Sequence, residues 1–202
     1  QPPAEPPDGA YSPEEMMIVA AGRAVAAAVA DRGHDVILAG VGVANLAAWM
    51  GHARVDGDAE LVAELGMYGY EPRPGEPFVF AQRNVSTVKQ LTGITGILGT
   101  MVGGPGTSAI GVLGAGQVDA SGAVNSTRTA DGRFLVGSGG ANDIVTTAQE
   151  VVLTVTHGQG RLVERVPYVT APGSRVGALV TTKAIFRRGQ GGRLELAGRL
   201  PS

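Results

Sequence analysis

Two short stretches contain the residues best suited to chemistry, and the first of them is rich in glycine. Residues 137–142, Gly-Ser-Gly-Gly-Ala-Asn, lie between an expected strand at 134–136 and an expected helix that begins near Ala141. Glycines let the backbone turn sharply and present its N–H groups to a ligand without side chains in the way. A following helix N-terminus adds partial positive charge. The segment suits a phosphate or a developing oxyanion, although a glycine turn without a ligand has the same pattern.

The second stretch contains Glu64, which ends an expected strand at 60–64 just before Gly66. Open α/β sheets place their ligand crevices at such strand ends. The apolar residues that follow would partly desolvate a carboxylate there, and this would make it a competent nucleophile or base. A solvated glutamate at the end of a strand is the plainer alternative. Glu60 and Glu71 compete for the role, but one begins the strand and the other lies in a proline-rich loop.

Other motifs are weaker. Residues 40–42, Gly-Val-Gly, follow an expected strand as in a dinucleotide-binding turn, but Asn45 stands where the third glycine should be. His34, His52 and His157 lack the spacing of metal ligands, so we expect no metal site. No Gly-x-Ser-x-Gly elbow is present, which argues against an ordinary serine hydrolase.

Composition narrows the class of protein. The 202 residues are 44% hydrophobic and 17% charged, which is enough to build a packed core. A formal net charge of −2 argues against general affinity for nucleic acid or an anionic membrane. Cysteine is absent, which excludes thiol catalysis and disulfides. No apolar run approaches the ~20 residues of a membrane span, and no secretory signal is visible, so we expect a cytoplasmic protein.

The order of expected elements predicts one α/β domain. Residues 1–11 contain four prolines and predict an extended arm, whereas Ser12, Pro13 and Glu15 form a helix start with a capping box. The helix should continue from that start to Gly33. Further helices are expected at 44–54 and, from apolar spacing weakened by glycines, within 86–106. Strands are expected at 35–40, 60–64, 108–113, 124–127, 134–136, 150–156, 168–170 and 178–186, with an irregular loop at 67–77. Strands that alternate with helices favour parallel βαβ units.

Several segments, taken in order, resemble the β subunit of family I CoA-transferases, the glutaconate CoA-transferase type in particular. They are Glu-Leu-Gly at 64–66, the glycine-rich run 114–127 that contains Gly-Gln-Val-Asp, Ser-Gly-Gly-Ala-Asn at 138–142, and Tyr-Val-Thr-Ala-Pro-Gly at 168–173. The resemblance implies a single three-layer α/β domain of the CoA-transferase type over residues 12–202, with a mostly parallel sheet.

The resemblance also implies a mechanism. A glutamate of that family attacks an acyl-CoA thioester and forms an acyl–glutamyl anhydride and then a glutamyl–CoA thioester; Glu64 falls on its position. Backbone N–H groups of the glycine loop would stabilise the oxyanion and bind CoA, and two amide side chains would line or brace the crevice. The loop residues are Ser138, Gly139, Gly140, Ala141 and Asn142, and the amides are Gln117 and Asn125. A CoA thioester is then the substrate, and no permanently bound cofactor is expected.

Such β subunits share their active site with an α subunit, so we expect a heterodimer or an α2β2 assembly. The sequence departs from the family at Leu65, where a small polar residue is common, and in a shortened loop after 171–173. A CoA-thioester hydrolase or a glutaconyl-CoA-type decarboxylase of the same fold therefore remains an alternative. A non-catalytic partner subunit that binds acyl-CoA is a second alternative.

Overall fold

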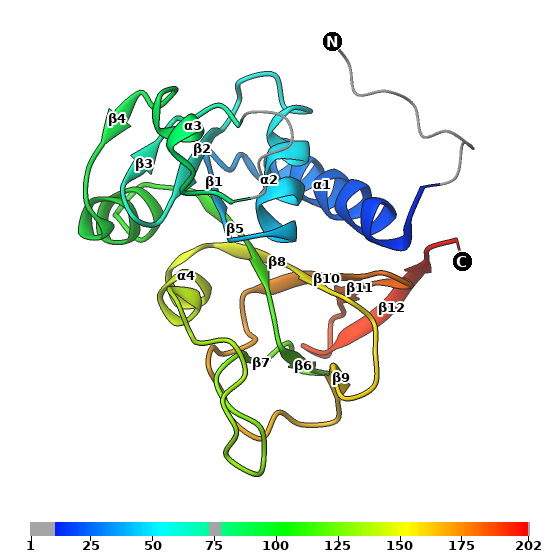
Figure 1. Ribbon diagram of the computed structural model, residues 1–202. Coiled ribbons are helices and arrows are strands. Elements are labelled where there is room, and N and C mark those ends of the chain that lie inside the picture. Colours follow the sequence, from blue (N-terminus) through cyan, green and yellow to red (C-terminus); the bar gives the residue numbers. More distant parts are fainter. Residues whose placement is uncertain (1–10, 73–77, 202) are drawn as a thin grey trace.

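A nine-stranded sheet of order β12-β11-β10-β8-β5-β1-β2-β3-β4 forms the centre of the molecule. The computed structural model describes residues 11–72 and 78–201 (Figure 1). The sheet strands are β1 (Val36–Ala39), β2 (Glu60–Ala63), β3 (Met67–Tyr68), β4 (Gln90–Leu91), β5 (Ala109–Gly114), β8 (Glu150–Val155), β10 (Val176–Thr181), β11 (Ala184–Arg188) and β12 (Leu194–Arg199). A second sheet of order β7-β6-β9 contains β6 (Gln117–Asp119), β7 (Val124–Asn125) and β9 (Leu162–Val163). The helices are α1 (Pro13–Arg32), α2 (Val43–His52), α3 (Gln82–Val85), α4 (Ala141–Thr147) and the π-helix η1 (Thr95–Val102).

The middle of the large sheet is parallel, as the alternating pattern predicts. Strand β1 pairs in parallel with both β2 and β5, β5 pairs with β8, and β8 pairs with β10. Antiparallel strands complete the two edges. Because the central strands run the same way, the segments that follow β1, β2 and β5 emerge at one edge of the sheet.

Alternation along the strands divides the interior into two apolar clusters. In β1, Ile37 and Ala39 pack in the cluster that contains α1 and α2, whereas Val36 and Leu38 pack in the cluster that contains η1 and α4. Successive strand side chains point to opposite faces, so a continuous apolar run serves both clusters. The result is three layers, with α1 and α2 over one face and η1, α4 and the small sheet over the other (Figure 1). The predicted three-layer α/β class is confirmed.

The first helix begins and ends as its sequence predicts. The Ser12 side chain accepts from the Glu15 N–H, and the Ser12 N–H donates to the Glu15 carboxylate at 2.7 Å, so the capping box is complete. Gly33 ends the helix with a φ of 68°, a left-handed conformation that favours glycine. Most of the expected arm, residues 1–10, lies outside the described residues, so the proposed boundary of the arm and the domain stays a prediction.

Two expected strands, 134–136 and 168–170, are wrong. The N–H groups of Val136 and Gly137 both donate to the carbonyl of Ser126, at 3.0 and 2.9 Å, which breaks the regular register that a ladder requires. Thr170 and Ala171 likewise both donate to Val124. In both segments isolated bridges replace a strand. The aromatic and β-branched composition predicted strands, but each segment makes a single bridge to its neighbour instead of a ladder of successive pairs.

The structure differs from the expected elements in four smaller respects. The expected loop 67–77 begins with β3, and its residues 73–77 lie outside the described part of the chain. The expected strand 178–186 is divided into β10 and β11, which pair antiparallel. The mixed segment 86–106 contains β4 and the π-helix η1. The edge strand β12, largely exposed, had not been expected at all.

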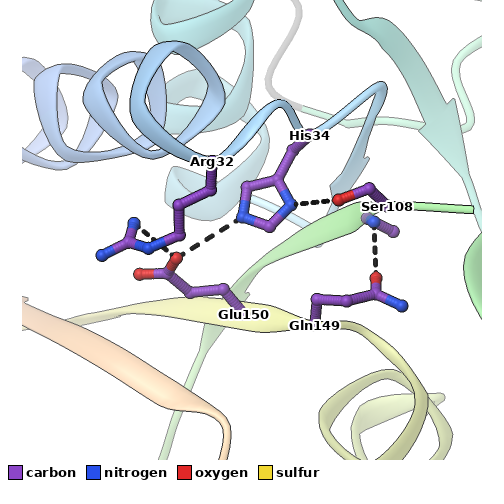
Figure 2. Close-up of polar contacts among 6 residues, drawn as sticks. Arg32, His34, Ser108, Gln149 and Glu150 are labelled. Carbon is purple, nitrogen blue, oxygen red and sulfur yellow. Dashed lines mark hydrogen bonds and ion pairs between the residues drawn. The ribbon is translucent and has the colours of Figure 1, made fainter.

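A polar cluster joins the amino ends of β1, β5 and β8, at the edge of the sheet opposite to the carboxyl ends of these parallel strands. Figure 2 shows its side chains. The ring of His34 lies before β1, with Nδ1 at 2.9 Å from the Ser108 hydroxyl and Nε2 at 3.5 Å from the Glu150 carboxylate. Arg32, from the end of α1, forms an ion pair of 2.7 Å with the same carboxylate. The side chain of Gln149 accepts from the Ala109 N–H. Since His34 and Glu150 are buried, this cluster satisfies polar groups that would otherwise be costly.

We expect Glu150→Ala to lower the free energy of unfolding by about 1–3 kcal/mol, because it leaves the buried His34 ring without its acceptor. Urea denaturation would measure the loss. Asp131→Ala is the matched control, because both side chains of its ion pair with Arg133 are exposed, and an exposed pair contributes little to stability. Equal losses in the two variants would contradict a structural role for the cluster.

Candidate active site

Glu64 lies in a tight turn at the carboxyl end of β2. Ala63 pairs with Met67 across the turn, so three residues, 64–66, connect β2 to β3. Gly66 has a φ of 127°, and a Cβ at this position would lie 2.0 Å from the Thr92 carbonyl oxygen. Only glycine fits this turn. The turn directs the Glu64 side chain into a cavity and leaves Leu65 56% exposed.

The glycine loop, residues 137–140, lies beside Glu64 although the two are more than 70 residues apart in the sequence. Gly137 and Gly139 have φ values of 115° and 49°, so the loop uses conformations that favour glycine. Gly140 follows and N-caps the seven-residue helix α4. Its N–H donates to the Glu64 carboxylate. A Cβ on Gly140 would lie 2.1 Å from Glu64 Oε2, so the two groups can be this close only because glycine has no side chain.

A cavity of about 510 Å³ contains both groups. Its walls come from the segments after β1, β2 and β5, from the glycine loop and from Arg161. Apart from Glu64, Arg161 and two serines, the lining is apolar or glycine; the serines are Ser126 and Ser138. This size and lining match a small-molecule site with a few polar groups.

Burial raises the pKa of Glu64 above its ordinary value. The hydrogen bond from the Gly140 N–H lowers this pKa, since it favours the charged carboxylate, and the nearby negative charge of Asp143 raises it. Partial burial dominates, so Glu64 is a more basic carboxylate than an exposed glutamate.

The structure brings together most, but not all, of the residues expected at the site. Ser138, Gly139, Gly140 and Ala141 line the cavity with Glu64, whereas Asn142 is exposed and donates to the Thr170 carbonyl at 3.1 Å. A role for Asn142 in binding through its side chain is therefore not supported by its position.

Gln117 and Asn125 do not line the cavity; they connect the strands beneath it. The Asn125 amide donates to the Gln117 side-chain oxygen and to the Arg128 carbonyl, each at 2.8 Å. The Gln117 amide in turn donates to the Gly160 carbonyl at 2.9 Å. Of the two expected roles, bracing the crevice agrees with these contacts, because the pair holds β6, β7 and the segment before β9 together.

Arg161 is a charged cavity residue that the sequence did not indicate. It follows 157–160, His-Gly-Gln-Gly, where no motif or periodic pattern marks a site. The Val118 N–H donates to its carbonyl at 2.9 Å, and its own Nη1 donates to the Gly116 carbonyl at 3.1 Å. Only the pairing of β6 with β9 brings it to the cavity.

The weaker motifs have structural roles. Gly40, directly after β1, packs closely against β5. A Cβ on Gly40 would lie 2.6 Å from the Val112 carbonyl oxygen. Asn45 is buried and accepts from the Tyr70 hydroxyl at 2.9 Å. Within residues 11–72 and 78–201 no three His, Cys, Asp or Glu side chains gather as metal ligands would. The same ranges contain no helix with the length and hydropathy of a membrane span.

The chain is similar in sequence to one of the subunits of a known CoA-transferase. It is 29% identical over 168 residues to a subunit of 3-oxoadipate CoA-transferase from Pseudomonas knackmussii, and the match covers 81% of this chain. The chain spans 62% of the length of that relative. No family model matches the sequence.

The fold is similar to those of two solved enzymes. Glutaconate CoA-transferase from Acidaminococcus fermentans superposes with a TM-score of 0.78 at 22% identity over 93% of this chain and 78% of that one. The decarboxylase AibA/AibB superposes with a TM-score of 0.74 at 20% identity over 94% of this chain and 78% of that one. The expected resemblance to CoA-transferase β subunits is confirmed, and at these identities the structures establish the fold.

We expect Asp143→Asn to lower the pKa of Glu64, because the substitution removes a negative charge that favours the protonated carboxyl. A ¹³C NMR titration of the side-chain carboxyl would measure this pKa. Asp131→Asn, in an exposed turn, is the control and should leave it unchanged. A Glu64 pKa that rises or stays constant in Asp143→Asn would contradict the electrostatics of the site.

Proposed function

We propose that this chain is the β-type subunit of a CoA-transferase in which Glu64 is the nucleophile. The observation that supports the proposal is the shared cavity of Glu64 and the Gly140 amide. A carboxylate is a weak nucleophile in water and needs a partly dry pocket together with donors for the oxyanion. The sequence similarity to a CoA-transferase subunit supports the same reaction.

In the proposed reaction a Glu64 oxygen attacks the thioester carbon of an acyl-CoA. The carbon–sulfur bond breaks, CoA leaves as a thiolate, and an acyl–glutamyl anhydride remains. The thiolate then attacks the glutamyl carbonyl, which releases the first carboxylate and forms a glutamyl–CoA thioester. An acceptor carboxylate repeats these two steps in reverse, so that Glu64 is regenerated and the acceptor leaves as a CoA thioester.

Backbone N–H groups of the loop 138–141 would stabilise the oxyanion that forms at each attack. The Gly140 N–H already donates to the Glu64 carboxylate, so a carbonyl oxygen bound beside that carboxylate would lie near the same amide group. Gln117 and Asn125 would support the loop from below without contact to the substrate. The CoA thioester is the substrate in this scheme, and the chemistry requires no permanently bound cofactor.

The same proposal includes a partner subunit. Large apolar side chains around the cavity are exposed: Val41 by 56%, Leu65 by 56%, Phe134 by 73% and Val136 by 72%. Exposed apolar side chains gathered at one place mark an interaction surface. An α subunit that covers them would also exclude water from Glu64, in a heterodimer or an α2β2 assembly. A cytoplasmic location fits a substrate that is an intracellular CoA thioester.

The test of the mechanism is a covalent adduct on Glu64. Incubation of the isolated complex with an acyl-CoA should add the mass of CoA, less water, to the peptide that contains Glu64. Glu64→Gln should yield no adduct and only background transfer. Full activity in Glu64→Ala would rule out the transferase mechanism. Turnover of the thioester without an adduct would favour the hydrolase or the decarboxylase, and binding without turnover would favour a non-catalytic subunit.

We expect Gly140→Ala to reduce transfer by about 10²–10³-fold, because its methyl group displaces the Glu64 carboxylate from the amide donor. The displaced atom is the end of a flexible side chain, so the thermal midpoint should change little. Gly198→Ala is the control, since a Cβ there meets no atom within 4 Å. Steady-state kinetics and a thermal melt together separate lost chemistry from lost folding.

The double substitution of Phe134 and Val136 by serine should weaken co-purification of the partner subunit by about tenfold or more, since both exposed side chains lose apolar contact area. Leu196→Ser is the matched control, because Leu196 is 55% exposed on the edge strand β12. A tagged chain isolated from its own cells would measure the partner recovered. Unchanged recovery with the double variant would exclude this surface as the interface.

A further inference from the structure

The cavity that contains Glu64 also contains a cation, Arg161, that forms none of the ion pairs found among the described residues. Among the described residues that line it, Glu64 and Arg161 are the two charged side chains. Ion pairs within the described ranges join Glu150 to Arg32 and His34, Glu60 to Lys89, and Asp131 to Arg133; they include neither Glu64 nor Arg161. Arg161 is exposed in the isolated chain. A partner subunit that excluded water from the cavity would make its unpaired charge costly, unless an anion binds to it.

The backbone around Arg161 fixes where its guanidinium lies. The pairing of β9 with β6 holds its main chain, and one guanidinium nitrogen donates to the Gly116 carbonyl. A guanidinium has five N–H donors in a planar fork that matches a carboxylate. One hydrogen bond orients the group and leaves other donors available at the cavity wall.

The position of Arg161 in the cavity indicates which part of the substrate its guanidinium would contact. A smaller cavity of about 140 Å³ has Arg161, Val41, Gly114 and Ala115 in common with the large one, so Arg161 lies where the two meet. Coenzyme A carries its phosphates at the far end of the long pantetheine arm. Because those phosphates lie far from the thioester, we assign an anion that reaches Arg161 within the same cavity as Glu64 to the acyl group.

We propose that Arg161 is a specificity residue that binds the free carboxylate of an acyl-CoA derived from a dicarboxylic acid. The inference rests on the proposed function, because it takes the thioester to lie at Glu64. In the bound state the guanidinium would form a charge-assisted, bidentate hydrogen-bonded pair with the carboxylate. A substrate of equal length without the second carboxylate would leave Arg161 unpaired.

The test compares glutaryl-CoA with its methyl monoester, which has the same acyl chain but no free carboxylate. Calorimetry on the complex isolated from its own cells should give about 10- to 100-fold tighter binding of the free acid. Arg161→Gln should remove this preference and leave binding of the ester unchanged. Arg161→Lys should retain part of the preference, because it keeps the charge but not the fork.

Arg165→Gln is the matched control, since Arg165 lies four residues further on and lines a separate cavity with Asp119 and Glu164. It should keep the full preference. Equal weakening of both ligands in Arg161→Gln would assign Arg161 to CoA phosphate or to structure, and an unchanged preference would exclude it from the site; either result overturns the inference. Binding requires no turnover. A complex that prefers the free acid through Arg161 but forms no Glu64 adduct would therefore refute the proposed transfer alone.

Discussion

The contact between the Glu64 carboxylate and the backbone of Gly140 is the constraint on which the site depends. It joins the turn after β2 to the loop before α4, two segments separated by 76 positions in the sequence. Its closeness requires glycine at 140, and the turn that presents the carboxylate requires glycine at 66. Partial burial keeps the carboxyl pKa raised, while the amide hydrogen bond limits that rise. The pocket therefore combines a basic carboxylate with a backbone donor.

The parallel sheet makes this contact possible, because it brings the ends of distant strands to one edge. The two edges of the sheet have different roles. At the amino ends of β1, β5 and β8, buried polar side chains satisfy one another around His34 (Figure 2). At the carboxyl ends, polar groups face a cavity and apolar groups face solvent. The first arrangement stabilises the fold, and the second is open to a ligand and a partner.

The similarity to known proteins supports the fold, and the residues of the site support the proposed reaction. Structural similarity at about a fifth identity establishes the fold, which CoA-transferases and a decarboxylase have in common. Two observations favour transfer within that fold, namely the carboxylate at position 64 and the sequence similarity to a CoA-transferase subunit. Arg161 narrows the proposed substrate further, because its charge would complement a second carboxylate on the acyl group.

Local sequence determined the elements whose signals are local. The capping box at Ser12, the buried strands and the glycines before α4 were all predictable, since periodicity and turn chemistry act over a few residues. The same signals failed at 134–136, where apolar side chains are exposed instead of paired in a sheet. Only the tertiary structure decided whether Gln117 and Asn125 line the cavity or brace it. It alone also showed that Arg161 reaches the cavity. Strand order and register bring those residues together, and no short stretch of sequence encodes a contact between segments so far apart.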